Sequence, residues 1–349
     1  MGFVTSDKML PLVVMRILLE ETDAEHPITL ELLCERVTDY YEPAACKWEN
    51  FKRKIARLLD EMMDFFETAE AYNMGGTYSV RSVTVPDKNG GRSHEKCYYI
   101  AKRLFTEEEL RLLCDSVCFS PGLSINDAKH MIEKLTRLAS KSFNNIFRFV
   151  FYSDIIFRTN NEKVFENLRI ISEAISRNCK VAVYYKERAT STVISPFFLV
   201  ISMGKYYVLS QCPGKSGLAP YRLDRISRIE LVANERRIVP QVVDGVDRSH
   251  FELSIYMKKH PRMYFDNSVE TVLLVRRDLL EAVRMEFYVL GIREHTDTYF
   301  RVKIQAPKAA ILNWIVNMTG LVMVVEDYGS GLVTSLQERA VGILEAYGG

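Results

Sequence analysis

The spacing of apolar residues predicts three helices at the start of the chain. Apolar positions recur every three or four residues over residues 10–20, in a segment that begins at Thr29 as its N-cap, and in a third segment after Pro43. In the third segment one face carries Phe51, Ile55, Leu58, Leu59 and Met62. Two β-rich segments, YSVRSVTV and KCYYIA, follow around a PDKNGG turn and predict a hairpin. Three helices followed by a hairpin are typical of a winged helix-turn-helix.

The pattern then changes twice along the chain. Acids after Thr106 and an amphipathic stretch over residues 126–140 predict two further helices, which we interpret as a connector. From Val181 short β-type runs separated by turn residues predict a small β domain, and strands alternate with helices after residue 267. We therefore predict an α+β protein with a winged helix-turn-helix at 1–104, a helical connector at 105–160, a β domain at 161–240 and an α+β domain at 241–349.

Composition supports a globular protein and excludes several classes. The chain has 349 residues, of which 48% are hydrophobic and 26% charged, and its net charge is only +1. Any affinity for a polyanion must therefore come from local clusters of charge. The apolar run 194–202 is far shorter than the roughly 20 residues that a membrane-spanning helix needs. The first residues do not resemble a signal peptide and the seven cysteines include no CxxC pair, so we expect a cytoplasmic protein.

Cations gather on the third helix and on the hairpin. Residues 43–57 hold five cations against Glu49 alone, and residues 79–103 hold six against two acids. A cationic helix face can enter the major groove of DNA while a basic hairpin follows the phosphates. The alternative is an ordinary solvated helix face and a basic turn. The predicted DNA contacts are Lys47, Lys52, Arg53, Lys54, Arg57, Arg92 and Lys96.

The β domain is also cationic. Residues 180–228 contain eight cations, two acids and five interleaved tyrosines, a combination that suits phosphates and stacked bases. Tyrosines in the core and cations in solvent would give the same composition. Gly214-Lys215-Ser216 lacks the earlier glycine of a phosphate-binding loop, and Cys114 and Cys118 are better explained as small buried thiols than, together with His130, as a metal site. No catalytic motif is present, so we expect neither an enzyme nor a cofactor or metal.

Three motifs in the β domain resemble the WYL domain, a small Sm-like or SH3-like β-barrel of bacterial regulators. Tyr206-Tyr207-Val208 stands in place of its Trp-Tyr-Leu triplet, and Ser195-Pro196 and the run 222–226 (RLDRI) match its other hallmarks. The run 51–55 is similar to the recognition helix of the attached winged helices, although Lys54 replaces the usual acid. The C-terminal part is similar to the extension called WCX.

The resemblance implies a bacterial DNA-binding transcriptional regulator, commonly a homodimer, whose barrel senses an anionic ligand. The expected ligand is a nucleotide or a short single-stranded nucleic acid, and the partner of the winged helix is double-stranded DNA. The positions carried over as ligand-binding are Tyr184, Ser195, Tyr206, Tyr207, Arg222 and Arg225. Paired arginines would hold a phosphate while a tyrosine offers a ring face. An RNA- or single-stranded-DNA-binding accessory protein of a CRISPR or other defence system is the alternative.

Overall fold

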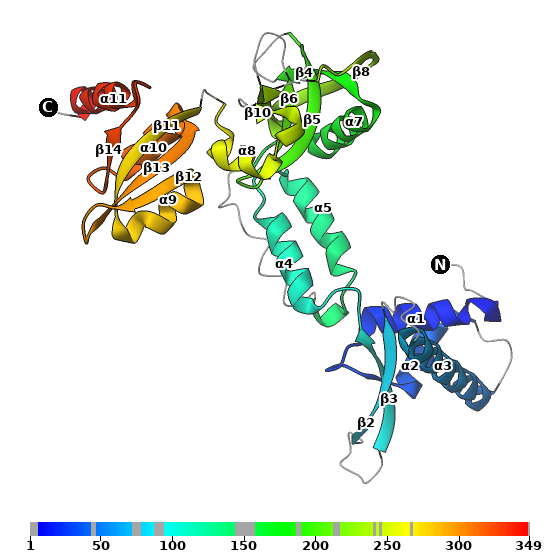
Figure 1. The fold of residues 1–349 in the computed structure, drawn as a ribbon. Coiled ribbons are helices and arrows are strands. Elements are labelled where there is room, and N and C mark those ends of the chain that lie inside the picture. The colour runs from blue at the N-terminus through cyan, green and yellow to red at the C-terminus, as the bar shows by residue number, and fades with distance from the viewer. Residues whose placement is uncertain are drawn as a thin grey trace. The chain divides into compact units, whose positions relative to one another are not determined.

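The chain folds into two compact units, which divide between Asn160 and Asn161 in a computed structural model (Figure 1). The structure describes residues 6–42, 47–71, 78–86, 94–143, 158–185, 190–211, 217–239, 242–243, 246–265 and 268–347. We describe each unit by itself.

The first unit contains a short 3-10 turn, helices and a small antiparallel sheet. Its elements are η1 (Asp7–Met9), α1 (Leu10–Glu21), β1 (Ile28–Thr29), α2 (Leu30–Thr38), α3 (Trp48–Ala71), β2 (Ser79–Pro86), β3 (His94–Lys102), α4 (Glu107–Cys118) and α5 (Ile125–Thr136). The sheet has the order β1-β3-β2, with Val80 opposite Ile100. The apolar faces of α1, α2 and α3 meet this sheet in one core that includes Leu18, Leu33 and Ile55.

Local sequence signals explain where these helices begin. The Thr29 hydroxyl accepts a hydrogen bond from the Leu32 amide at 3.2 Å, as expected for the predicted N-cap of α2. Thr106 and Glu109 form a reciprocal capping box at the start of α4. Because both signals act within one helical turn, the sequence predicted these helix starts correctly.

The second unit begins with a helix and a five-stranded antiparallel sheet. Its first elements are α7 (Val164–Arg177), β4 (Cys179–Tyr185), β5 (Thr192–Ser202), β6 (Lys205–Gln211), β7 (Leu218–Arg222), η3 (Leu223–Arg225) and β8 (Ile226–Arg236). The strand order is β7-β6-β5-β4-β8. A two-residue turn joins β5 to β6, and both of its residues have positive φ, Met203 at 50° and Gly204 at 68°.

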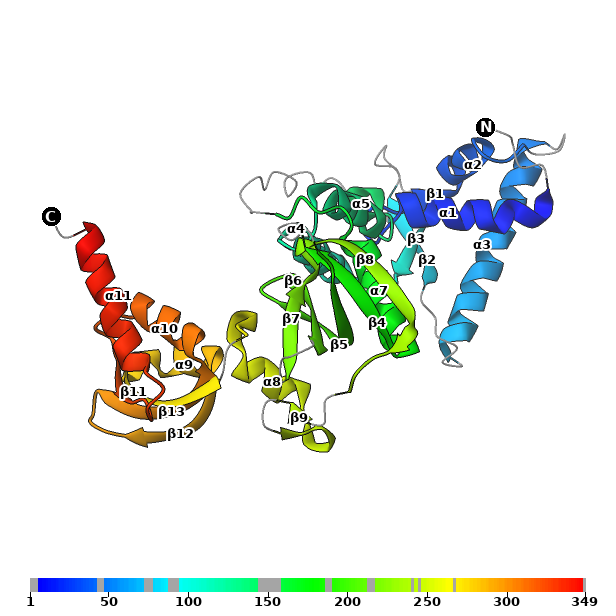
Figure 2. The same cartoon turned by 90° about the horizontal axis from the view of Figure 1, so that it is seen from above.

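Both faces of this sheet are covered. Ile171 and Ala174 of α7 pack on one face against Val181 and Val208, and Figure 2 shows α7 lying along β4. The opposite face packs against Tyr256 and Met263, which belong to the next group of elements. Those elements are β9 (Val242–Val243), β10 (Val246–Asp247), η4 (Arg248–His250), α8 (Leu253–Lys259) and η5 (Pro261–Met263).

The chain ends in a second, four-stranded sheet. Its elements are β11 (Ser268–Arg276), η6 (Arg277–Leu279), α9 (Leu280–Glu286), β12 (Tyr288–Glu294), β13 (Tyr299–Pro307), α10 (Lys308–Asn317), β14 (Val322–Glu326) and α11 (Leu332–Tyr347). The order β12-β13-β11-β14 and the strand–helix–strand–strand–helix–strand succession give the split βαβ arrangement. Val302 and Ile304 of β13 pack with Ile311 and Trp314 of α10 in its core.

The predicted α+β class is confirmed. The predicted closed barrel is not observed, because β7 and β8 stand at opposite ends of the strand order and do not pair within the described ranges. A sheet packed on both faces, by α7 and by the segment around Tyr256, buries its apolar side chains without closing.

Candidate functional site

The outer face of α3 carries exposed cations. Phe51, Ile55 and Leu59 are buried in the core of the first unit. An α-helix turns about 100° per residue, so Arg53 and Arg57 lie on the side opposite this apolar stripe, and both are exposed. Arg57 Nε lies 3.1 Å from Glu61 Oε1 one turn later. The exposed side chains of Lys47 and Arg53 have no ion pair with any residue that the structure describes.

Two other predicted DNA contacts lie on the flanks of α3 and are paired with carboxylates. Lys52 is only 23% exposed, and its Nζ lies 3.3 Å from Glu49 Oε1 and 3.6 Å from Glu31 Oε1 on α2. The bond with Glu49 raises the pKa of Lys52. On the other flank, Lys54 Nζ lies 2.6 Å from Asp7 Oδ1. Asp7 also accepts a hydrogen bond from the Tyr41 hydroxyl, so Lys54 is held toward the start of the chain.

The hairpin contributes fewer free cations than its composition suggests. Lys96 Nζ lies 3.1 Å from Asp60 Oδ1 on α3 and 5.2 Å from the centre of the Tyr98 ring. Desolvation opposes ionisation there, but the bond to Asp60 prevails and raises the pKa of Lys96. Arg92, also predicted to contact DNA, falls outside the described residues. The hairpin therefore rests against α3 through a cation that is already neutralised.

The charge of the exposed face changes sign along α3. Over the first three turns the exposed Arg53, Lys54 and Arg57 outnumber one exposed acid, Glu49, which is paired with Lys52, whereas Asp60, Glu61 and Asp64 are exposed farther along, followed by Glu67. No Lys or Arg follows Arg57 within α3. Phosphates would be attracted to the first half of this helix and repelled by the second.

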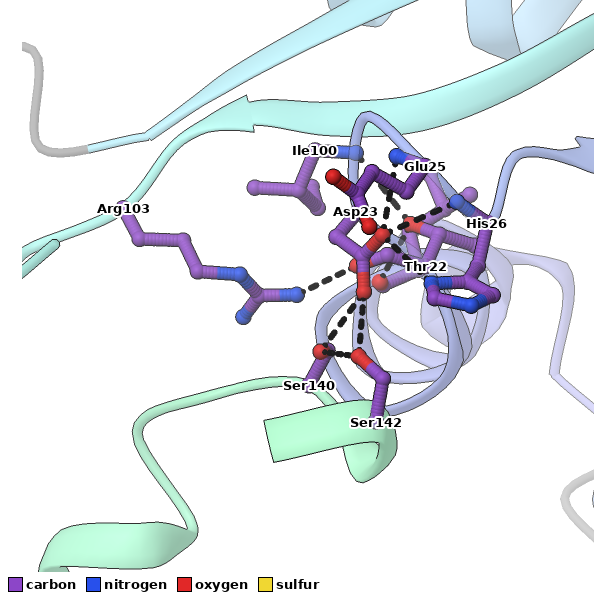
Figure 3. A network of polar contacts seen from close by, with 9 residues as sticks. Thr22, Asp23, Glu25, His26, Ile100, Arg103, Ser140 and Ser142 are labelled. Carbon is purple, nitrogen blue, oxygen red and sulfur yellow. Dashed lines mark hydrogen bonds and ion pairs between the residues drawn. The ribbon is translucent and has the colours of Figure 1, made fainter. Parts of the chain in front are cut away.

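A polar network around Asp23 joins α1 to the turn after α5 (Figure 3). The Asp23 carboxylate accepts hydrogen bonds from the hydroxyls of Ser140, at 2.8 Å, and Ser142, and from the backbone amides of Glu25 and His26. His26 Nδ1 donates to the same carboxylate at 2.8 Å. One carboxylate therefore holds two segments that are more than a hundred residues apart in the sequence.

The neighbours of Asp23 decide its ionisation. Burial alone would raise the pKa of Asp23, but the hydrogen bonds from Ser142, Ser140 and His26 outweigh it and hold that pKa far below its usual range. The hydrogen bond between the His26 side chain and the Asp23 carboxylate also raises the pKa of His26. Beside it, Arg103 Nη2 donates to the Thr22 carbonyl at 2.6 Å, and the Ile100 amide donates to the Thr22 hydroxyl. The end of α1, the end of β3 and the turn after α5 are thus bound together.

In the second unit, three of the predicted ligand-binding residues, Tyr207, Arg222 and Arg225, lie together near the start of β6 and the end of β7. Tyr207 is paired with Arg222 across the two strands, and Arg222, Asp224 and Arg225 all influence its ionisation. Desolvation raises the pKa of Tyr207. Arg222 binds Asp224 through two parallel bonds, Nε–Oδ1 at 2.9 Å and Nη2–Oδ2 at 2.6 Å. Arg225 is exposed and has no hydrogen bond or ion pair with any residue that the structure describes.

The backbone of this arginine cluster is positioned by two buried asparagines that the sequence analysis missed. Asn161 Nδ2 donates to the carbonyls of Asp224, at 3.1 Å, and Ile226, at 2.8 Å. Asn167 Nδ2 donates to the Ile226 carbonyl at 2.9 Å. Both asparagines are buried. Asn167 stands at an apolar-face position of the amphipathic helix α7, and this was the signal available in the sequence.

The other predicted ligand-binding residues lie apart from this cluster. Tyr206 is on the sheet face covered by α7, whereas Tyr207 is on the opposite face. Ser195 is buried opposite Gln211, four residues along β6 from Tyr207, and its hydroxyl accepts from the Ile238 amide at 2.9 Å. Tyr184, on β4, donates to Glu230 at 3.3 Å, with the Arg228 guanidinium 5.4 Å from its ring centre.

Within the described residues, no group of three or more His, Cys, Asp and Glu side chains is placed to hold a metal ion. Cys114 and Cys118 are buried among Leu110 and Ile132, and burial raises the pKa of the Cys114 thiol to about 11. The segment Gly214–Ser216 lies outside the described residues. No helix in the described ranges is long and apolar enough to cross a membrane.

Two solved structures are similar to this chain at low sequence identity. Proteasome accessory factor B/C (PafBC) of Arthrobacter aurescens is 17% identical, with a TM-score of 0.30, over 72% of this chain and 38% of that one. A CRISPR Cas-related protein is 12% identical, with a TM-score of 0.38, over 98% of this chain and 81% of that one. The chain thus spans little more than a third of the length of PafBC. A search of curated proteins found no match.

The family comparison falls on the region where the arginine cluster lies. Residues 166–231 match the family model of the WYL domain. This segment contains most of α7, strands β4 to β7, η3 and the first half of β8. It includes Tyr207, Arg222 and Arg225 as well as Asn167. The chain therefore contains a WYL domain, at residues 166–231.

Proposed function

We propose that this protein is a bacterial, cytoplasmic transcriptional regulator that binds double-stranded DNA through a winged helix-turn-helix made of α1–α3, β2 and β3. The observation that carries the proposal is the exposed cationic face over the first three turns of α3, opposite its buried stripe. A helix with this division can present long cationic side chains to the major groove while its apolar side stays in the core. A homodimer belongs to the proposal, since helix-turn-helix proteins commonly bind two half-sites. The proposed role is binding rather than catalysis.

The WYL domain is proposed to bind an anionic effector, a nucleotide or a short single-stranded nucleic acid. Arg222 is neutralised by Asp224, so it contributes little net positive charge. Arg225 is exposed and near Tyr207, and it supplies the cation for a phosphate. The two asparagines fix the backbone on either side of Arg225, which prepares its position before the effector arrives.

The DNA-binding role is tested by removing one exposed cation. Arg57→Ala should weaken binding to duplex DNA and reduce the slope of log affinity against log salt by about one, because one fewer counterion is released. Arg169→Ala is the matched control, since Arg169 is also exposed and pairs with a glutamate one helical turn later, on α7. Fluorescence anisotropy over a range of salt concentrations measures both variants. Equal slopes for the two variants would contradict the assignment.

The effector site is tested by Arg225→Ala. Binding of ATP or of a short fluorescent oligothymidylate should weaken by about tenfold, because a charge-assisted hydrogen bond to phosphate is lost. Arg228→Ala is the control, since Arg228 is exposed in the same domain but bound to Glu230. A loss in the Arg228 variant alone would move the site to the surface around Tyr184.

Competition between duplex and single-stranded nucleic acid distinguishes the alternative function. A regulator should prefer duplex DNA through the first unit and respond to single strands through Arg225. A defence-system accessory that binds RNA or single-stranded DNA should prefer single strands, and Arg57→Ala should then leave its main binding activity unaffected.

A further inference from the structure

Asn50 shares the exposed face of α3 with Arg53 and Arg57, beside the exposed Glu49, which is paired with Lys52. Asn50, Arg53 and Arg57 follow each other at intervals of three and four residues, so they form one stripe. All three are exposed, and the stripe lies opposite Phe51, Ile55 and Leu59. Asn50 was not among the residues that the cationic composition indicated, because it carries no charge.

The polar groups of Asn50 and Arg53 are unoccupied within the described part of the chain. The backbone amide of Asn50 donates to the Lys47 carbonyl at 2.9 Å, but its side-chain amide has no hydrogen-bond partner there. The Arg53 guanidinium likewise has neither a carboxylate nor a carbonyl partner in those ranges. Lys52 and Lys54, the cations on either side of Arg53, are both paired. The Asn50 amide and the Arg53 guanidinium, each of which can make two parallel hydrogen bonds to one ligand, are therefore available for binding.

These two side-chain types match the edges of particular bases. An arginine donates two hydrogen bonds to O6 and N7 of guanine, and an asparagine exchanges two with N6 and N7 of adenine. Positions 50 and 53 are about 4.5 Å apart along the helix axis, which is close to the rise of one or two base pairs. Arg57 stands next to the acids that begin at Asp60, and its guanidinium already lies beside Glu61.

We propose that Asn50 and Arg53 determine the sequence preference of this protein, Asn50 selecting adenine and Arg53 selecting guanine one or two base pairs away. Arg57 contacts a phosphate at the edge of the groove. The inference rests on the proposed DNA-binding function. The contact surface from Lys47 to Arg57 is about 15 Å long, so each copy covers about four base pairs with this helix. The acids Asp60, Glu61 and Asp64 prevent contact farther along α3.

The test compares the base preferences of the full chain with those of two variants. Duplexes are selected from a random-sequence library with the wild type, Asn50→Ala and Arg53→Lys. Arg53→Lys keeps the positive charge but loses the planar pair of donors. It should therefore keep its salt dependence while its preference for guanine at one position falls by roughly 5- to 100-fold. Asn50→Ala should lose the adenine preference by a similar factor and keep the guanine preference.

The outcomes separate this inference from the function on which it rests. If the wild type enriches no duplex, the proposed function fails. If the wild type enriches a defined site and both variants select that site with unchanged preferences, DNA binding stands and the assignment of Asn50 and Arg53 is overturned. Circular dichroism of each variant establishes that α3 remains folded.

Discussion

Replacing Arg222 with alanine should destabilise the WYL sheet by about 2–4 kcal/mol. The substitution removes both hydrogen bonds that Arg222 donates to Asp224. The Asp224 side chain is only 6% exposed and Arg222 is 23% exposed, so the remaining carboxylate keeps a charge that water reaches poorly. Removing one partner of a buried ion pair destabilises a fold by more than the intact pair stabilises it, because the other charge stays buried and unpaired. The opening free energy of β6 and β7, measured by hydrogen exchange, reports the loss.

The matched variant for this measurement is Arg225→Ala. Arg225 is three residues away, exposed and without a carboxylate partner in the described ranges, so its loss should change stability by less than about 0.5 kcal/mol. Equal opening free energies for the two variants would show that the Arg222–Asp224 pair does not stabilise the sheet. Arg225 rather than Arg222 is therefore the residue to replace in the effector-binding test, because weak binding by an Arg222 variant would reflect a destabilised domain.

Asp23→Ala should lower the stability of the first unit by about 2–4 kcal/mol at neutral pH. The carboxylate accepts hydrogen bonds from two backbone amides, from the hydroxyls of Ser140 and Ser142 and from His26. Ser140 is buried and depends on this acceptor. Exchange should accelerate both at the end of α1 and in the turn after α5 (Figure 3). Glu25→Ala is the control, because it removes an exposed carboxylate from the same turn and leaves the acceptor in place.

The pH dependence of this destabilisation follows from the lowered pKa of Asp23. A carboxylate whose pKa is lower in the folded state stabilises the fold above the pKa of the unfolded chain, near 4, and loses that contribution as pH falls toward the folded value. The contribution of Asp23 ionisation to the stability difference between wild type and Asp23→Ala should therefore be full at pH 7 and fall below about pH 4. His26 titrates in the opposite sense, and NMR should show that its raised pKa falls in the variant. A stability difference between wild type and Asp23→Ala that did not change with pH would contradict the proposal that the ionised carboxylate of Asp23 stabilises the fold.

Several features were predictable because their causes are local. The periodic apolar residues of α3 defined its buried stripe, and the caps at Thr29 and Thr106 act within one turn. Short motifs also placed the WYL domain, which the family model covers over residues 166–231. Local composition identified the cationic stretches, but it did not show which of their cations are paired with carboxylates in the fold. It therefore gave Lys52 and Arg53 equal weight, and it passed over Asn50, which has no charge.

By itself the sequence determined several helices and strands, such as α2, α3 and α4, since periodicity and capping depend on residues within a few positions of one another. Only the tertiary structure decided which cations remain available. Lys54 meets Asp7 and Lys96 meets Asp60 across 47 and 36 positions of the chain, while Arg53 and Arg225 are left exposed. Asn161 reaches the Asp224 carbonyl over 63 positions. Such pairings depend on how elements pack, and a cation that packing places against a carboxylate of another element contributes less to binding.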